Sequence, residues 1–238
     1  MEDWISIALL TLMAGLAMPV GAAIARVERI RPRWLEKEVR HGVIAFGGGA
    51  LLAAVALVLV PHGMRNLHPL LIAVSFAGGG GVFMALDRWL AARGTSASQL
   101  VAMLSDFVPE ALALGATFVV SNEAGLLLAM IVTLQNLPEG FNASRELTAS
   151  THYRGSKIVI AFALLALLGP ISGLTGYFLL SDFPQVVSGI MLFAAGGILY
   201  LVFQDIAPQS KLQRHWLPPL GAVAGFLLGM LGKVATGG

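Results

Sequence analysis

The chain of 238 residues is 57% hydrophobic and only 12% charged, with a formal net charge of +2. Soluble domains carry about 25% charged residues, so this composition excludes a protein whose whole surface faces water. Cysteine is absent, which excludes a disulfide framework and a thiolate metal site.

The apolar residues fall in blocks of about 20, long enough to cross roughly 30 Å of hydrocarbon as helices. A transmembrane β-barrel would show alternating polar and apolar residues instead, and the blocks show no such alternation. We therefore expect an all-α integral membrane protein with eight transmembrane helices. In chain order they lie near residues 4–25, 41–61, 68–87, 98–120, 124–144, 156–180, 185–207 and 217–236. The connections are too short for a separate soluble domain, so residues 1–238 are expected to form a single transmembrane domain.

Lysine and arginine concentrate in alternate connections. All but two of the 15, Arg65 and Lys233, belong to the first, third, fifth and seventh connections. Because basic loops stay in the cytoplasm, both termini are expected to face outward. The same alternation favours an even number of spans.

Two sequence patterns recur in spans that cross the membrane in opposite directions. In spans two and seven, Phe46 precedes Pro61 by the same distance that Phe193 precedes Pro208. In spans four and five, a Pro-Glu pair stands in similar polar surroundings. Inverted repeats with interrupted helices at mid-membrane are typical of secondary transporters, so a single transmembrane transporter domain is predicted. Chance similarity between helices rich in glycine and alanine is the alternative.

Spans four and five are predicted to form a hairpin around residues 121–124, with Pro109 and Pro138 at similar distances from the turn. The two Pro-Glu pairs are therefore expected near the membrane centre. Each proline lacks an N–H and frees the carbonyl four residues earlier, at Ser105 and Leu134. In lipid a freed carbonyl needs a partner, and a bound cation or a water molecule would supply one.

The polar side chains of this hairpin are spaced to share helix faces. Residues four apart lie on one face, which groups Asp106 with Glu110 and Gln135 with Glu139. Asn136 lies about 100° around the helix from Gln135, close enough to border the same site. These five residues are the predicted metal ligands.

The chemistry of this group favours a divalent cation. Carboxylates at the bilayer centre are costly and normally face a cavity or a partner, and no Lys or Arg lies in the middle of these two spans. Carboxylate and amide oxygens suit hard or borderline divalent ions. Protonated carboxyl groups that hydrogen-bond neighbouring helices are the structural alternative. Ser105, Gln204 and Asp205 are possible secondary ligands, although a helix cap explains the last two equally well.

At these residues the chain resembles the ZIP (Zrt/Irt-like) family of divalent-metal transporters, whose motif is close to His-Asn-x-Pro-Glu-Gly. Residues 135–140, with Gln135 in the first place, match it well and look like a bacterial branch. In span four, Asp106 stands for the usual His and Phe107 for the usual Asn. Span seven, from Phe193 to Pro208, is also similar to the family. We therefore expect a divergent bacterial-type member.

The resemblance implies eight spans with both termini outside, a metal site built from spans four and five, elevator-type motion and a homodimer. The cargo it implies is a divalent ion such as Zn²⁺, Mn²⁺, Fe²⁺ or Cd²⁺, with no prosthetic group. The expected location is a cell membrane, in particular a bacterial inner membrane. The partners are then metal ions, the lipid bilayer and a second copy of the chain, and no nucleic acid. One departure stands out, because Gly169 occupies the place where the family often has Glu before the span-six proline.

Of three alternatives to metal transport, the sequence leaves two open and disfavours one. A proton- or sodium-coupled carrier of a small solute would use the same carboxylates as protonation sites. A ZIP-like metal sensor would bind metal without transporting it. An intramembrane hydrolase is disfavoured, because the sequence has no HExxH, GxSxG or GxGD motif, and we expect no enzymatic activity.

Overall fold

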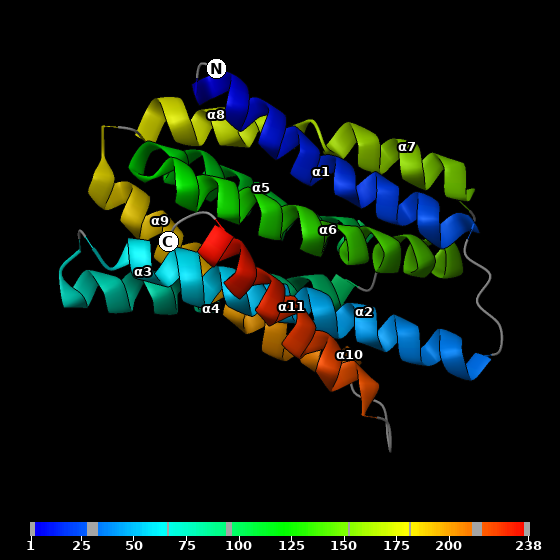
Figure 1. Cartoon of the computed structure of the whole chain (residues 1–238). Helices are drawn as coiled ribbons and strands as arrows, with labels where there is room; N and C mark the ends of the chain where they lie inside the picture. The colour runs from blue at the N-terminus through cyan, green and yellow to red at the C-terminus, as the bar shows by residue number, and fades with distance from the viewer. Residues whose placement is uncertain are drawn as a thin grey trace.

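The structure is a computed structural model, which describes residues 3–27, 33–65, 67–93, 97–151, 153–180, 182–210 and 216–235. The described chain is built of helices joined by short connections (Figure 1). In chain order these are α1 (Asp3–Val27), α2 (Arg33–Ala54), the π-helical segment η1 (Val55–Leu59), α3 (Val60–Gly63), α4 (Pro69–Arg93), α5 (Ala97–Val120), α6 (Asn122–Ser150), α7 (Gly155–Leu165), α8 (Leu168–Leu180), α9 (Pro184–Leu201), the π-helical segment η2 (Val202–Ile206), α10 (Ala207–Ser210) and α11 (Leu217–Ala235).

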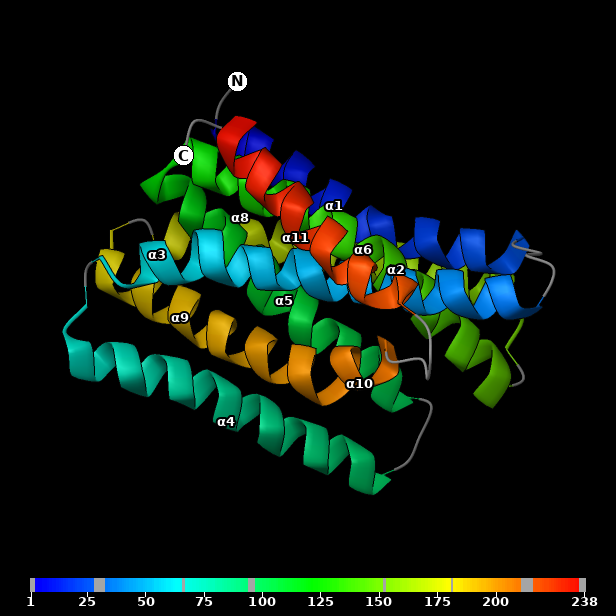
Figure 2. The ribbon, with the colours of Figure 1, turned by 60° about the horizontal axis from the view of Figure 1, so that its bottom comes forward.

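These segments make eight rods, which confirms the predicted all-α membrane fold. The segments α2, η1 and α3 follow one another without a break, as do α9, η2 and α10, and α7 with α8 forms the sixth rod. Seven rods of the described chain are long and apolar enough to cross a membrane. In the remaining one, α5, the apolar part found among the described side chains is Phe107–Val119. The start of α1 and the end of α11 lie at the same end of the molecule (Figure 2).

The sixth rod is interrupted, whereas the sequence predicted one span over residues 156–180. Helix α7 ends at Leu165 and α8 begins at Leu168. Pro170 explains the break, because it has no N–H to donate to the carbonyl of Ala166. The backbone N–H of Gly169 donates to that carbonyl instead, over 3.1 Å.

The repeat in spans two and seven has a structural counterpart. Segments η1 and η2 start equally far after Phe46 and Phe193, and both end two residues before a proline, Pro61 or Pro208. Each proline removes one backbone donor, and a local π-helical turn accommodates such a loss. The carbonyl freed by Pro61 belongs to Leu57, and it accepts a hydrogen bond of 3.2 Å from the Lys233 ammonium group.

The rods sort into two bundles by their packing. In the first bundle α1 packs on α6, α7 and α8, and α5 packs on α6 and α8. In the second bundle α2 packs on α11, and α4 packs on α9. Figure 1 shows the first bundle in the upper half and the second in the lower half. Helix α6 meets α2, and α5 meets α9, where the bundles touch.

Glycine decides how closely helices approach within each bundle. A Cβ atom at Gly140 would overlap the backbone of Met18 in the first bundle, and one at Gly225 would overlap the backbone of Phe46 in the second. Across the boundary, a Cβ at Gly47 would lie 3.4 Å from the ring of Pro138, which is a much looser contact. Helices therefore interlock backbone to backbone inside a bundle, whereas these contacts between bundles involve side chains.

Candidate metal site

The α5–α6 hairpin brings the two Pro-Glu pairs into the same bundle, with Glu110 opposite Gln135 rather than opposite Glu139. Ser121 alone interrupts the helices, in an extended conformation with φ −162° and ψ 122°. Its hydroxyl oxygen accepts a hydrogen bond from the backbone N–H of Ala124, which caps α6. A one-residue turn sets the two helices antiparallel, but Pro109 lies 12 residues before Ser121 and Pro138 lies 17 residues after it, so the two prolines are offset along the hairpin.

Glu110 on α5 and Gln135 on α6 meet in the interior of the first bundle. The Nε2 group of Gln135 donates to both carboxylate oxygens of Glu110, each at 2.7 Å. Glu110 is 3% exposed and Gln135 is fully buried. The sequence placed the two residues on separate predicted faces, and the structure brings these faces together.

Glu139, one turn after Gln135, completes a pair of carboxylates. It lies within range of electrostatic repulsion from Glu110, and it is partly buried. Two carboxylates that face each other in a low-dielectric interior are unfavourable unless a cation or a proton compensates their charge. The arrangement therefore offers a cation two negative ligands from two helices.

Asn136 is held toward α1. Its side-chain N–H donates to the carbonyl of Ala14 over 2.9 Å, and it is 1% exposed. This bond fixes which way the amide points and joins α6 to α1. Three buried side-chain oxygens have no hydrogen-bond partner among the described residues: Gln135 Oε1, Asn136 Oδ1 and Asn142 Oδ1. A buried acceptor without a donor is costly, and a bound cation would remove that cost.

Asn142 is a candidate that the sequence reasoning missed. It lies seven residues after Gln135 and three after Glu139, so all three project from one face of α6. The signal was present in the sequence, since positions i, i+4 and i+7 share a helical face. The Pro-Glu pair lies in the middle of α6, and Asn142 lies one turn further along the helix.

The remaining predicted ligands are only partly described. The backbone of Ser105 and Asp106 belongs to α5, one turn before Glu110, but their side chains lie outside the described part of the structure. Gln204 and Asp205 belong to η2 in the second bundle, so they are not part of the α5–α6 group. Asp205 lies within electrostatic range of Asp87 and Glu146. Among the described residues, no three His, Cys, Asp or Glu side chains gather around one point.

Two of the departures from the ZIP pattern, Phe107 and Gly169, are in contact. The Phe107 ring is buried at 1% exposure, and its Cζ atom would lie 2.8 Å from a Cβ placed on Gly169 and 2.9 Å from one placed on Gly15. A Cβ on Gly169 would also lie 2.5 Å from the carbonyl oxygen of Thr11. The aromatic ring therefore occupies the space beside Gly169, and a glutamate there would collide with it.

Comparison with known proteins agrees with this architecture. The family profile described as ZIP Zinc transporter matches residues 91–235, from the end of α4 to the end of α11. No curated protein matches the chain. The matched region contains the whole α5–α6 hairpin and covers more than half of the sequence, so the chain belongs to the ZIP zinc transporter family, whose members are membrane transporters of divalent metals rather than enzymes.

Proposed function

We propose that this chain carries divalent metal cations across a membrane through an oxygen-lined site between α5 and α6. The proposed ligands are Glu110, Gln135, Asn136 and Glu139, with Asp106 one turn away. One observation carries the proposal: Glu110 is buried within electrostatic range of Glu139, while α5 contains no lysine or arginine. A divalent ion supplies the two positive charges that this pair lacks.

The donor set favours ions that accept oxygen ligands. Carboxylate and amide oxygens suit Mn²⁺ and Fe²⁺ well, whereas Zn²⁺ gains more from imidazole. We therefore propose that Mn²⁺ or Fe²⁺ competes effectively with Zn²⁺ and Cd²⁺ at this site. On release of the ion, the Gln135 amide already bonded to Glu110 keeps that carboxylate hydrogen-bonded.

The test is uptake into proteoliposomes that contain the purified chain. Zn²⁺, Mn²⁺, Fe²⁺, Co²⁺ and Cd²⁺ are offered singly and in competition, with protein-free vesicles as the control. Saturable uptake of at least one ion is expected. If metal binds with no uptake, the chain is a metal sensor, and if an ion gradient drives uptake of an organic solute without metal, it is a coupled carrier.

We also propose that the first bundle moves as one body against the second, in an elevator-type motion. Support comes from the two kinds of helix contact. Inside bundles, helices such as α1 and α6 approach with backbone against backbone at Gly21 and Gly140, which resists sliding. Between bundles, the contacts that Gly47 and Gly229 make with α6 involve the side chains of Pro138 and Ile131. Side chains can repack during sliding, whereas interlocked backbones cannot.

Cross-linking tests this motion without background, because the chain has no cysteine. A Cβ on Gly232 would meet the Met130 side chain across the boundary, and replacing Met130 by Cys opens that space. Bridging Met130→Cys to Gly232→Cys with a short bifunctional reagent should stop uptake, and reversal should restore it. The control pair, Phe118→Cys with Gly125→Cys, bridges α5 to α6 inside the first bundle and should leave uptake intact. Uptake that continues through the locked boundary contradicts the elevator proposal.

Two further expectations concern assembly and orientation. A homodimer is proposed through α4, because its face opposite α9 is uncovered and a Cβ on Gly78 or Gly81 would meet nothing within 4 Å. Small residues on an open membrane face allow close helix association, and mass photometry in nanodiscs measures the oligomeric state.

For orientation, a cysteine that replaces Asn122 should react with an impermeant thiol reagent outside intact cells, and a cysteine that replaces Arg154 should not.

A further inference from the structure

Two consecutive residues near the middle of α1 contact both helices of the candidate metal site. The carbonyl of Ala14 accepts a hydrogen bond of 2.9 Å from the Asn136 side chain of α6. Gly15 lies against Phe107 of α5, since a Cβ placed on Gly15 would be 2.9 Å from the Cζ atom of that ring. The same Cβ would be 2.8 Å from the carbonyl oxygen of Ala166, between α7 and α8. Helix α1 thereby connects the two halves of the site at one level.

The ring of Phe107 ends in a notch between two glycines. The side chain is 1% exposed, and its Cζ atom would lie 2.8 Å from a Cβ on Gly169 of α8, nearly the same distance as from one on Gly15. Carbon atoms in favourable contact are about 3.5–4.0 Å apart, so neither glycine could carry a side chain while the ring stays in place. The notch therefore holds the tip of the ring from both sides.

Phe107 precedes Glu110 by one turn of α5. Three residues of α-helix correspond to about 4.5 Å along the axis and about 60° around it, so the ring and the carboxylate leave neighbouring sides of α5. Pro109, between them, lacks an N–H and leaves the carbonyl of Ser105 without its helical donor. The backbone of this turn has one hydrogen bond fewer than an ordinary helix, which leaves side-chain packing to hold its orientation.

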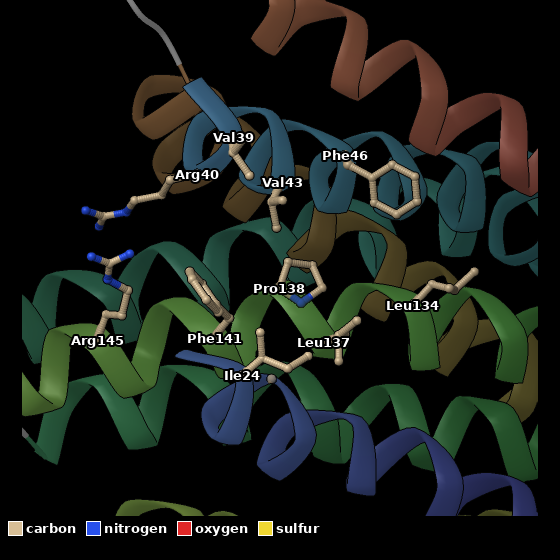
Figure 3. A pocket seen from close by; sticks show the side chains of 11 residues that line it. Ile24, Val39, Arg40, Val43, Phe46, Leu134, Leu137, Pro138, Phe141 and Arg145 are labelled. Atoms are coloured by element: carbon tan, nitrogen blue, oxygen red, sulfur yellow. The ribbon is translucent and has the colours of Figure 1, made fainter. Parts of the chain in front are cut away.

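The flank of α6 beside the other carboxylate is packed more loosely. Pro138, the residue before Glu139, lines a cavity of about 440 Å³ between α1, α2 and α6. Figure 3 shows Pro138 among aliphatic and aromatic side chains, with Arg40 and Arg145 at one end. Glu110 is 3% exposed, whereas Glu139 is only partly buried. The tight anchor therefore belongs to α5 and to Glu110.

We infer that Phe107 is a positioning residue for Glu110. Its ring is seated between Gly15 and Gly169 and fixes the rotation of α5 about its axis. That rotation keeps the Glu110 carboxylate directed at the amide of Gln135, which donates to both of its oxygens. The consequence for metal affinity rests on the proposed function, whereas the orientation of Glu110 does not.

The orientation of Glu110 is measured without metal, in the full chain in nanodiscs, by its reactivity toward dicyclohexylcarbodiimide. This apolar reagent modifies carboxyl groups inside membranes, and peptide mapping assigns the product to Glu110 or Glu139. Phe107→Leu leaves the notch partly empty, so α5 can turn. Glu110 should then react roughly tenfold faster, the factor that corresponds to one lost hydrogen bond. The rate at Glu139 should not change.

Phe118→Leu is the matched control for this variant. Phe118 is also on α5, and its ring also packs on a glycine, since a Cβ on Gly125 of α6 would overlap it. It lies eight residues beyond Glu110, so Phe118→Leu removes the same atoms from the same helix and should leave the reactivity of Glu110 unchanged. Equal acceleration in both variants overturns the inference, as does the absence of acceleration in Phe107→Leu.

A second pair of variants disturbs the ring from α8 and leaves α5 unmodified. Gly169→Ala adds a methyl group that meets both Thr11 and the Phe107 ring. Gly173→Ala, one turn later on α8, adds a methyl group whose nearest neighbour is Thr11. Only the first should accelerate labelling of Glu110. This pair decides the question if Phe107→Leu does not fold, and equal labelling in the two variants then overturns the inference.

Metal binding is measured separately on the same variants. Affinity for Mn²⁺ should fall roughly tenfold in Phe107→Leu, the lower end of the loss expected when a group that orients a ligand is removed, and stay unchanged in Phe118→Leu. At saturating Mn²⁺, the electron paramagnetic resonance spectrum of the bound ion should also differ in Phe107→Leu, because it depends on ligand geometry rather than on the stability of the fold.

The two measurements separate this inference from the proposed function. If the unmodified chain binds no Mn²⁺, the proposed function fails, while carboxyl labelling still decides the role of Phe107. If Glu110 reacts faster in Phe107→Leu but affinity and spectrum stay unchanged, the ring orients the carboxylate and Glu110 is not a ligand. If affinity falls without any change in labelling, Phe107 does not act through Glu110 and the inference is wrong.

Discussion

The two bundles of this protein are built from similar amounts of apolar helix but distribute polar groups very differently. Of the buried polar side chains in the described chain, all but Ser188 belong to the first bundle. They include Glu110, Gln135 and Asn136, which the proposed site uses, and Thr11, Thr117, Ser144 and Ser172. The interior of the second bundle consists almost wholly of apolar side chains and glycine backbones.

This difference fits the proposal that the ion-binding residues belong to the first bundle. Polar groups inside a membrane protein are expensive and persist where they have a function. A hydroxyl group can donate its hydrogen bond within its own helix, as that of Thr117 does to the carbonyl of Ala113, four residues earlier. The amides and carboxylates cannot do so and depend on partners from other helices. The comparison therefore supports the proposal that the first bundle carries the cargo and the second is the fixed frame.

The largest effect is expected from the carboxylate that α6 contributes. Glu139→Gln keeps the shape of the side chain but removes one of two negative ligands. Metal affinity should fall by more than roughly 100-fold, beyond the 10–100-fold that follows loss of a group that only orients a ligand. Calorimetric titration with Mn²⁺ and Zn²⁺ measures this change.

Ser188→Ala, the matched change in the second bundle, removes a buried polar group and should leave metal affinity unchanged. Equal affinities for Glu139→Gln and the unmodified chain would mean that Glu139 is not a ligand. The hydrogen-bonded, metal-free explanation of the carboxylates would then gain support.

The next largest effect is a loss of stability, which should be larger for a glycine inside a bundle than for one at the boundary between bundles. Gly140→Ala places a methyl group against the backbone of Met18, and overpacking of this kind costs about 1–3 kcal/mol. Gly47→Ala faces Pro138 across the boundary at 3.4 Å and should cost less than about 0.5 kcal/mol. Thermal unfolding in detergent, followed by circular dichroism, ranks the two variants. A larger loss of stability for Gly47→Ala would contradict the view that the bundles interlock internally and only touch at their boundary.

A smaller effect is expected at Asn142, whose buried oxygen has no hydrogen-bond partner among the described residues. Asn142→Leu removes that oxygen and the cost of burying it, about 1–3 kcal/mol, so stability should rise. If the oxygen contributes to the metal site, affinity should fall at the same time by roughly tenfold. Asn142→Asp retains an oxygen at that position and serves as the control for affinity. Higher stability with unchanged affinity would remove Asn142 from the site.

The smallest effect concerns selectivity. Asp106→His replaces a charged oxygen ligand with the imidazole found in the family pattern. The preference for Zn²⁺ over Mn²⁺ should rise by less than about tenfold, because nitrogen ligands favour Zn²⁺. Competition titrations of the two metals measure the ratio. Asp106→Asn is the control, since it removes the charge without supplying nitrogen, and an equal shift in both variants would show that charge rather than imidazole sets the preference.

Much of this arrangement was fixed by the order of residues along the chain. Blocks of about 20 apolar residues determine eight rods, since helices must satisfy their own backbone in lipid. Helical spacing alone places Gln135, Glu139 and Asn142 on one face. The shared distances from Phe46 to Pro61 and from Phe193 to Pro208 indicated a repeat, and η1 and η2 lie at equivalent positions within it. These features depend on neighbours within a few turns, which a sequence records directly.

Tertiary structure alone decided which distant residues meet. The bond from Asn136 to the carbonyl of Ala14 joins helices 122 residues apart in the chain, and no periodicity encodes it. The position of the Phe107 ring beside Gly15 and Gly169 depends on how three helices pack. The cavity between Arg40 and Arg145 exists because α2 and α6 come from different bundles that do not close completely. Such contacts arise from the shapes of whole packed surfaces, which local spacing along one helix does not specify.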